Sequence, residues 1–317
     1  MLFKQALKVE SMEKSDLLLL AINRLPEINF RGKRRLASVL DTEDDFLKLP
    51  ALEAGRISGF EGLKWNPGAA LEAAENDLLV LSRIGGAFVY VDGDLYPPLL
   101  NEMYDSPFLL FYRGMEDLLI KASRGCDWIS IVGTRQPSYE ALEKAYEFAS
   151  VFAENNIPVV SGLAYGIDSA AHRGAVEAGR SVAVLPSGID SIYPRGNSSL
   201  AGRIMDRGGL LVSEYPPESK AVKWHFPQRN RIISALSRGV VIVEAPEKSG
   251  ALITVDFALQ QNRDVFVAGE KEGRVFGTGC EKLAGDGAVV ISTPQEVIDL
   301  WNTNPCWSAR LCGRLDE

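Results

Sequence analysis

The chain has 317 residues, of which 46% are hydrophobic and 24% are charged, so it can bury a sizeable core. Lysine and arginine number 34 against 42 acidic residues, and the formal net charge is -8. This acidic balance excludes a protein coated uniformly in positive charge, but it leaves room for a local basic site. The longest uninterrupted apolar run, Leu17–Ile22, is far shorter than the roughly 20 residues of a membrane span, so we expect none.

The first residues of the chain alternate charged and apolar groups and lack the apolar core and cleavage site of a signal peptide. The four cysteines form no Cys-x-x-Cys pair, and the only histidines in the sequence are His172 and His225. Few side chains are therefore available to bind a metal. We expect a cytoplasmic protein with reduced cysteines, no metal site and no cofactor.

Residues 1–84 predict a small α-helical domain. The stretches with apolar residues at helical spacing are 15–25, 31–40 and 70–85. The first of them has an N-cap candidate in Ser15 or Asp16 and ends at Pro26. The extended segments expected to follow this domain are a strand over 87–93 and the proline-punctuated stretches 96–100 and 106–114.

From Trp128 the pattern changes to short β-rich segments that alternate with helical stretches. The predicted strands are 128–133, 158–163, 181–188, 209–215, 239–245, 264–269 and 288–292. The predicted helices between them are 140–155, 167–179, 198–208, 229–238 and 251–262. This alternation predicts an extended Rossmann-like domain over 85–300, with a doubly wound, mostly parallel sheet, and an irregular tail over 301–317.

Open α/β sheets bind ligands at the carboxyl ends of their strands, so the residues after each strand are the first candidates for a site. Gly133 permits close backbone approach, and Arg135 carries a guanidinium suited to phosphate. Ser161–Gly162 and Ser249–Gly250 precede helices, where backbone N–H groups favour an anion. The dinucleotide fingerprint G-x-G-x-x-G follows none of the strands, which disfavours a nicotinamide-dependent dehydrogenase.

Three other polar residues near strand ends have a structural and a catalytic interpretation. Asp168 is a helix cap or a site residue, and it shares a helix face with His172 four positions later. The two form either an acid–base pair or a structural hydrogen bond, and the second is favoured because no G-x-S-x-G nucleophile is adjacent. Glu244 ends an apolar strand, and we expect it to be a structural partner of Arg229 or Arg231.

The segment 195–238 is locally basic, with eight lysines or arginines against three acidic residues, a charge of +5. Its densest part, 223–231, places Trp224 and Phe226 among the cations. Cations that neutralise phosphates, beside rings that stack on bases, are typical of proteins that bind single-stranded nucleic acid. The alternative is a solvated basic helix whose two aromatic side chains fill the core.

These stretches together resemble the DNA-processing protein A (DprA, or Smf) family. The matching motifs are GTRQPS at 133–138, SGLAYGID at 161–168, PSGID at 186–190, YPRGN at 193–197, SEYPP at 213–217, FPQRNRIISALSRGVVIVEA at 226–245 and SGALIT at 249–254. The resemblance extends over about 95–300. It implies a non-enzymatic protein of natural transformation that binds incoming single-stranded DNA, usually as a homodimer, and helps load RecA recombinase on it.

The resemblance also implies the DNA-binding residues. Phe226 would stack on a base, while Arg135 and Lys223 would hold the neighbouring phosphates. The other candidate site residues are Gly133, Ser161, Gly162, Arg229, Asn230, Arg231, Ser249 and Gly250. We expect no catalytic residue.

Three regions depart from the family's pattern. The N-terminal domain, often similar to a sterile alpha motif in this family, has the sequence Leu25–Phe30 where relatives have a Gly-Ile-Gly hairpin, which disfavours hairpin-type DNA contact. Ala268–Gly269 replaces a Pro-Gly step, and the atypical loop 270–283 follows where relatives make dimer contacts. No winged-helix domain is expected after Leu300.

The alternative function is a nucleotide-processing phosphoribohydrolase that cleaves an N-glycosidic bond. Such Rossmann-like enzymes use an arginine and a glutamate near a P-G-G-x-G-T-x-x-E loop. The comparable stretch here, EAPEKSGALIT at 244–254, lacks the double glycine and the downstream glutamate. This difference favours DNA binding over catalysis.

Overall fold

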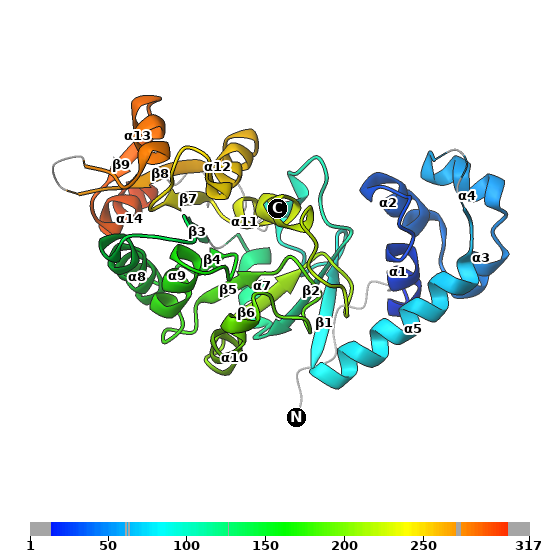
Figure 1. Ribbon diagram of the computed structural model, residues 1–317. Coiled ribbons are helices and arrows are strands. Elements are labelled where there is room, and N and C mark those ends of the chain that lie inside the picture. Colours follow the sequence, from blue (N-terminus) through cyan, green and yellow to red (C-terminus); the bar gives the residue numbers. More distant parts are fainter. Residues whose placement is uncertain (1–13, 61, 63, 126, 271–273, 304–317) are drawn as a thin grey trace. The chain divides into compact units, whose positions relative to one another are not determined.

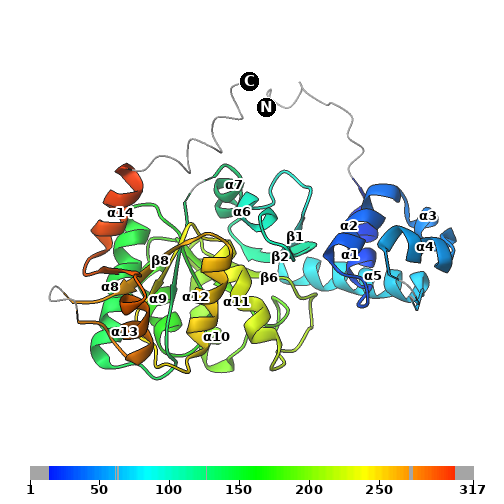
Figure 2. The ribbon, with the colours of Figure 1, turned by 90° about the horizontal axis from the view of Figure 1, so that it is seen from above.

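The computed structural model describes residues 14–60, 62, 64–125, 127–270 and 274–303, and the chain divides into two compact units between Leu79 and Val80 (Figures 1 and 2). Among these residues, no helix has both the length and the apolar character needed to cross a membrane. The same residues contain no cluster of three or more histidine, cysteine, aspartate or glutamate side chains that could hold a metal. Cys126, Cys306 and Cys312 lie outside them, whereas Cys280 is buried as a free thiol.

The N-terminal unit is helical. Its helices are α1 (Asp16–Asn23), α2 (Phe30–Val39), α3 (Glu43–Lys48), α4 (Ala51–Ser58) and the greater part of α5 (Pro67–Ile84). Ser15 is the N-cap of α1, because its side chain accepts a hydrogen bond from the Leu18 N–H. Helices α3 and α4 are short and were not predicted, since neither is long enough to show a clear apolar periodicity. The segment Leu25–Phe30 turns into α2, which Asn29 caps by accepting a hydrogen bond from the Gly32 N–H at 2.9 Å.

The second unit is built on a nine-stranded sheet in the order β1-β2-β6-β5-β4-β3-β7-β8-β9. The strands are β1 (Gly86–Tyr90), β2 (Leu109–Gly114), β3 (Ile129–Val132), β4 (Val159–Ser161), β5 (Ser181–Val184), β6 (Leu210–Ser213), β7 (Gly239–Ile242), β8 (Asp264–Ala268) and β9 (Val289–Ile291). Strands β3 to β9 pair in parallel, and β1 and β2 extend the sheet beyond β6 in antiparallel fashion. The predicted doubly wound, mostly parallel sheet is confirmed.

Helices cover both faces of this sheet. They are α6 (Pro98–Asn101), α7 (Asp117–Ser123), α8 (Tyr139–Glu154), α9 (Ile167–Ala175), α10 (Ser198–Asp206), α11 (His225–Ala235), α12 (Gly250–Gln260), α13 (Thr278–Gly285) and α14 (Pro294–Thr303). Figure 1 shows α8, α9 and α10 on one side and α11 and α12 on the other, as right-handed crossovers require. Phe148 and Phe152 of α8 pack with Ile129 and Val241 in a fully buried core on the α8 side.

Several boundaries differ from those expected. Residues 96–100 were expected to be extended, but Pro98 opens the short helix α6, because proline fixes φ near the helical value and needs no N–H partner there. Helix α11 begins at His225, four residues before the predicted start. Helix α14 extends to Thr303, and 304–317 of the expected tail lie outside the described residues. In the atypical loop 270–283, α13 begins at Thr278, and 271–273 are likewise outside.

Candidate nucleic-acid interface

A pocket of about 770 Å³ opens where the strand order of the sheet reverses. The chain runs from β3 through β4 and β5 to β6 in one direction, and from β7 to β9 in the other. The loops that leave β3 and β7 therefore diverge, and the pocket lies between them, as in other doubly wound sheets. The segments that line it are 132–136, Ala164, Asp168, Tyr193, Lys223, 226–227, 229–230, Ile233, Pro246, 248–251 and 253–254. Its volume is in the range of sites that hold small organic ligands.

The lining of this pocket is positively charged although the chain is acidic. The lining contains one carboxylate, that of Asp168, and four cationic side chains: Arg135, Lys223, Arg229 and Lys248. Arg135, Lys223 and Lys248 are exposed, whereas Arg229 is buried at the base of the pocket. These cations come from three segments of the chain: the loop after β3, the segment 223–229 and the loop before α12. Their convergence creates a local site for an anion such as a phosphate.

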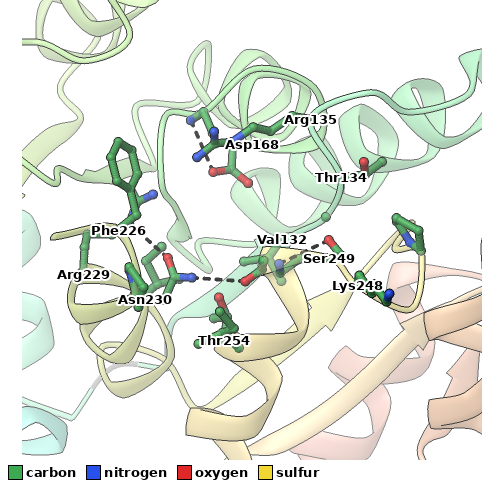
Figure 3. A pocket seen from close by; sticks show the side chains of 18 of the residues that line it. Val132, Thr134, Arg135, Asp168, Phe226, Arg229, Asn230, Lys248, Ser249 and Thr254 are labelled. Atoms are coloured by element: carbon green, nitrogen blue, oxygen red, sulfur yellow. Dashed lines mark hydrogen bonds between the residues drawn. The ribbon is translucent and has the colours of Figure 1, made fainter. Parts of the chain in front are cut away.

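An aromatic ring lies among these cations (Figure 3). The Arg135 guanidinium lies over the Phe226 ring, with Cζ 5.4 Å from the ring centroid. Tyr193 approaches the same ring edge-on, with centroids 5.4 Å apart at an interplanar angle of 72°. Phe226 is half-buried and lines the pocket, so part of its ring is accessible to a flat ligand. A smaller cavity of about 80 Å³ adjoins it, lined by Tyr165, Pro186 and Phe226 among others.

Arg229 fixes the base of the pocket. Its Nη1 donates hydrogen bonds to the carbonyls of Gly162 and Val184, which follow β4 and end β5. Burial lowers the pKa of Arg229 to about 10, and the nearby Asp168 charge opposes that shift, so the guanidinium stays protonated at neutral pH. A Cβ on Gly162 would lie 2.4 Å from Arg229 Nη1. Glycine at this position therefore admits the arginine beneath the loop.

Asp168 and His172 are structural, and each binds the loop after β4. Asp168 accepts hydrogen bonds from the backbone N–H groups of Gly162 at 3.2 Å and Ala164 at 3.3 Å. His172 Nε2 accepts from the Leu163 N–H at 3.2 Å, and its Nδ1 is 2.8 Å from Ser181 Oγ. Burial raises the pKa of Asp168 and, together with the Arg229 charge, lowers that of His172 to about 3.

The remaining predicted site residues at the pocket shape its rim. Gly133 lines it, and a Cβ there would lie 2.6 Å from Ile167 Cγ1, so this glycine lets α9 approach β3 closely. Ser249 caps α12 by accepting a hydrogen bond from the Ala251 N–H at 3.2 Å. Asn230 Nδ2 donates to the Gly250 carbonyl at 3.3 Å, which links α11 to the start of α12.

Three predicted site residues are absent from the lining of this pocket: Gly162, which lines the adjoining smaller cavity, and Ser161 and Arg231, which lie away from it. Ser161 is fully buried and donates to the Ile131 carbonyl at 2.7 Å. Arg231 is directed toward the carboxylates of Glu214 and Asp105, where it forms ion pairs. Both therefore have structural contacts instead of a place in the pocket lining.

The expected pairing of Glu244 with Arg229 or Arg231 is wrong. Its Oε2 accepts hydrogen bonds from the backbone N–H and the hydroxyl of Ser138, both at 2.8 Å. Glu244 therefore joins the end of β7 to the N-terminus of α8.

Lys248 and Tyr193 line the pocket but were not among the predicted site residues. A sequence signal existed for each of them. Lys248 directly precedes the Ser249–Gly250 step that opens α12, and Tyr193 follows the third predicted strand closely. Whether these two side chains reach the pocket depends on the conformations of their loops, which the sequence pattern did not specify.

The comparisons with known proteins agree with the fold and the motifs. The family model described as DNA recombination-mediator protein A matches residues 87–302. The DNA processing protein DprA of Streptococcus pneumoniae is 41% identical over 206 residues, which are 65% of this chain and 71% of that protein. DprA of Bacillus subtilis is 40% identical over 205 residues, 64% of this chain and 67% of that protein.

Solved structures extend the similarity to three dimensions. The X-ray structure of the Streptococcus pneumoniae DprA matches with a TM-score of 0.71 at 32% identity, covering 90% of this chain and 98% of that one. A DprA structure from Helicobacter pylori, described for its single-stranded DNA binding mode, matches with a TM-score of 0.60 at 27% identity. The match covers 68% of this chain and 96% of that one. Motifs, sheet order and comparisons agree, and the chain belongs to the DNA recombination-mediator protein A (DprA/Smf) family.

Proposed function

We propose that this protein binds single-stranded DNA in the pocket at the β3/β7 strand ends. The observation that carries the proposal is the position of the Phe226 ring beneath the Arg135 guanidinium, with Lys223 and Lys248 in the same lining. An unpaired base would stack at Phe226, and the cations would hold the phosphates on either side of it. The single-stranded DNA binding described for the Helicobacter pylori relative supports the same ligand.

The shape of the site favours single strands over duplexes. Phe226 is half-buried inside a pocket, so a base must leave its stack to reach the ring. In a duplex, unstacking and unpairing a base costs a few kcal/mol, whereas this cost is smaller in a single strand because its bases are already unpaired. The proposed binding mode therefore selects single strands over duplexes without recognising their base sequence.

The site supports binding without catalysis. The one carboxylate in the pocket lining, Asp168, already accepts hydrogen bonds from two backbone N–H groups. Glu244, at the place where a phosphoribohydrolase would carry catalytic chemistry, is held by Ser138. Both carboxylates thus accept hydrogen bonds that hold loops in place, which favours a non-enzymatic role over glycosidic bond cleavage.

We further propose that the protein acts in the cytoplasm as a homodimer, and that residues 1–84 form a separate helical domain.

We also propose that the protein hands bound DNA to RecA recombinase in natural transformation. Membership in a family of recombination mediators supports this handover. A RecA ATPase assay on DNA covered by single-strand binding protein tests it. We expect this protein to shorten the lag before RecA assembles, and an unchanged lag would contradict the proposal.

DNA binding itself is tested by fluorescence anisotropy with a labelled oligothymidine and with a duplex of equal length. We expect tighter binding of the single strand and an affinity that falls steeply with salt, because phosphate contacts release counterions. Equal affinity for both ligands, or no binding of the single strand, would contradict it. Incubation with nucleoside monophosphates is the parallel test, in which released free base would favour the hydrolase.

A further inference from the structure

An exposed aromatic ring that does not line the pocket, Trp224, lies beside it in the sequence segment that leads into α11. Its side chain is 64% exposed, although a tryptophan gains strongly from burial. Lys220 and Lys223, on the same segment before α11, are also exposed. Trp224 is not part of the pocket lining, but its neighbour Lys223 is. An indole presented to solvent among cations is suited to stack on a base whose phosphates those cations attract.

The indole of Trp224 is held in place from below. The rings of Tyr215 and His225 stack with centroids 3.7 Å apart at 18°. Trp224 meets them nearly at right angles, 4.1 Å from His225 and 6.3 Å from Tyr215. His225 is itself buried, with Nδ1 2.8 Å from the Pro186 carbonyl oxygen. These contacts support the indole while leaving most of it in solvent, so stacking a ligand on it would immobilise little further side-chain freedom.

The backbone that carries Trp224 is also anchored. The Glu218 N–H donates to Asp190 Oδ1 at 2.7 Å, and the Ser219 carbonyl accepts from the Gly188 N–H at 2.8 Å. The His225 N–H donates to the Val222 carbonyl at 3.0 Å, immediately before α11. The exposed ring is therefore part of an ordered surface next to the pocket.

We infer that Trp224 is a second stacking platform, which binds a base of the same DNA strand just outside the pocket that contains Phe226. This inference rests on the proposed function. Trp224 and Phe226 are two residues apart, so their Cα atoms lie within about 7.6 Å of each other. Lys223 directly precedes Trp224 and lines the pocket, so it would contact a phosphate at the point where the strand leaves the pocket. The continuity of the surface and its positive charge argue for nucleic acid as the occupant.

The experiment compares a dinucleotide, which fills only the pocket, with an oligothymidine of about 12 nucleotides, long enough to reach beyond it. Affinities are measured by competition for the wild type, Trp224→Ala, Trp224→Phe and Phe226→Ala. Trp224→Ala is expected to weaken the affinity for the longer ligand by about 5- to 150-fold and to leave the affinity for the dinucleotide unchanged. Trp224→Phe is expected to restore most of the lost affinity, because it keeps a ring.

Tyr146→Ala is the matched control, because Tyr146 is an aromatic residue of α8 that is 49% exposed, and α8 covers the other face of the sheet. It is expected to bind both ligands as the wild type does. Quenching of tryptophan fluorescence by the longer ligand is a second readout, expected to be greater for the wild type than for Trp224→Phe. Thermal unfolding of each variant confirms that it is folded at the temperature of the titration.

The outcomes separate the inference from the proposed function. If Phe226→Ala weakens both ligands while Trp224→Ala binds the longer one like the wild type, the platform is disproved and the pocket stands. If Trp224→Ala weakens the dinucleotide as much as the longer ligand, Trp224 acts on the pocket itself and the inference is also wrong. If the wild type binds neither ligand, the proposed function fails and the inference fails with it.

Discussion

The Arg135 guanidinium and the Phe226 ring form a cation–π pair, with 5.4 Å from Cζ to the ring centroid. Arg135 belongs to the loop after β3 and Phe226 to the first turn of α11, and both line the pocket. Each side chain therefore limits the motion of the other before any ligand arrives. A ligand that meets a preformed cation and ring loses less free energy to side-chain ordering.

Phe226→Ala is expected to weaken single-stranded DNA binding by about 1–3 kcal/mol, because it removes the proposed stacking ring. Anisotropy titration measures the change. Arg135→Ala is expected to weaken binding as well, and the double variant is expected to lose less than the sum of the two, because the side chains are in contact. Strict additivity would show that the pair does not act as a unit.

Lys248→Ala is expected to reduce the slope of log affinity against log salt concentration by about 0.7, the value for one lost phosphate contact on a single strand. Lys248 is exposed and lines the pocket. Arg203→Ala is the control, because Arg203 is an exposed cation of α10 that pairs with Glu177 and is absent from the lining. An unchanged slope for Lys248→Ala would remove this residue from the proposed site.

Gly162→Ala is expected to lower the free energy of unfolding by about 1–3 kcal/mol, because its Cβ would overlap the Arg229 guanidinium, which is buried and cannot move freely. Gly250→Ala is the matched control, since a Cβ there meets nothing within 4 Å. It is expected to leave stability unchanged or slightly raised. Urea unfolding measures both, and equal stability of the two variants would contradict this account.

His172 is expected to make stability depend on pH in the acid range. Burial and the Arg229 charge lower its pKa from 6.5 to about 3 in the folded protein, so between these values the unfolded chain binds the proton and the folded chain does not. The contribution of neutral His172 is present above about pH 6.5 and is lost as pH falls toward 3, by up to about 1.4 kcal/mol per pH unit.

The variant His172→Gln isolates this effect, because glutamine does not titrate. The stability difference between wild type and variant, measured by urea unfolding from pH 7 to pH 4, is expected to shrink as the pH falls. Curves that stay parallel over this range would show that His172 is not the group responsible. Asp168, whose pKa burial raises, is present in both proteins and so does not affect the comparison.

The chain's own sequence determined the architecture of the second unit. Segments such as 239–243 are apolar throughout and alternate with helical stretches, and only a sheet covered on both faces buries such strands. The rule that doubly wound sheets bind at strand ends then identified Gly133, Arg135 and Gly250 as candidates, and all three line the pocket. The short helices α3 and α4 could not be predicted, because helices of this length are stabilised mainly by tertiary packing and show little apolar periodicity of their own.

The tertiary structure alone decided which cations face the site. The sum of +5 over 195–238 includes side chains that pair elsewhere: Arg203 and Arg207 with Glu177, Arg231 with Glu214, and Arg238 with Asp127.

Arg135 and Lys248, from outside that segment, complete the charge of the pocket. The sequence left open whether Trp224 and Phe226 fill the core or belong to a binding site. In the structure Trp224 is exposed and Phe226 is half-buried. Charge and composition are sums along the chain, whereas a site depends on the direction of each side chain, which partners distant in sequence determine.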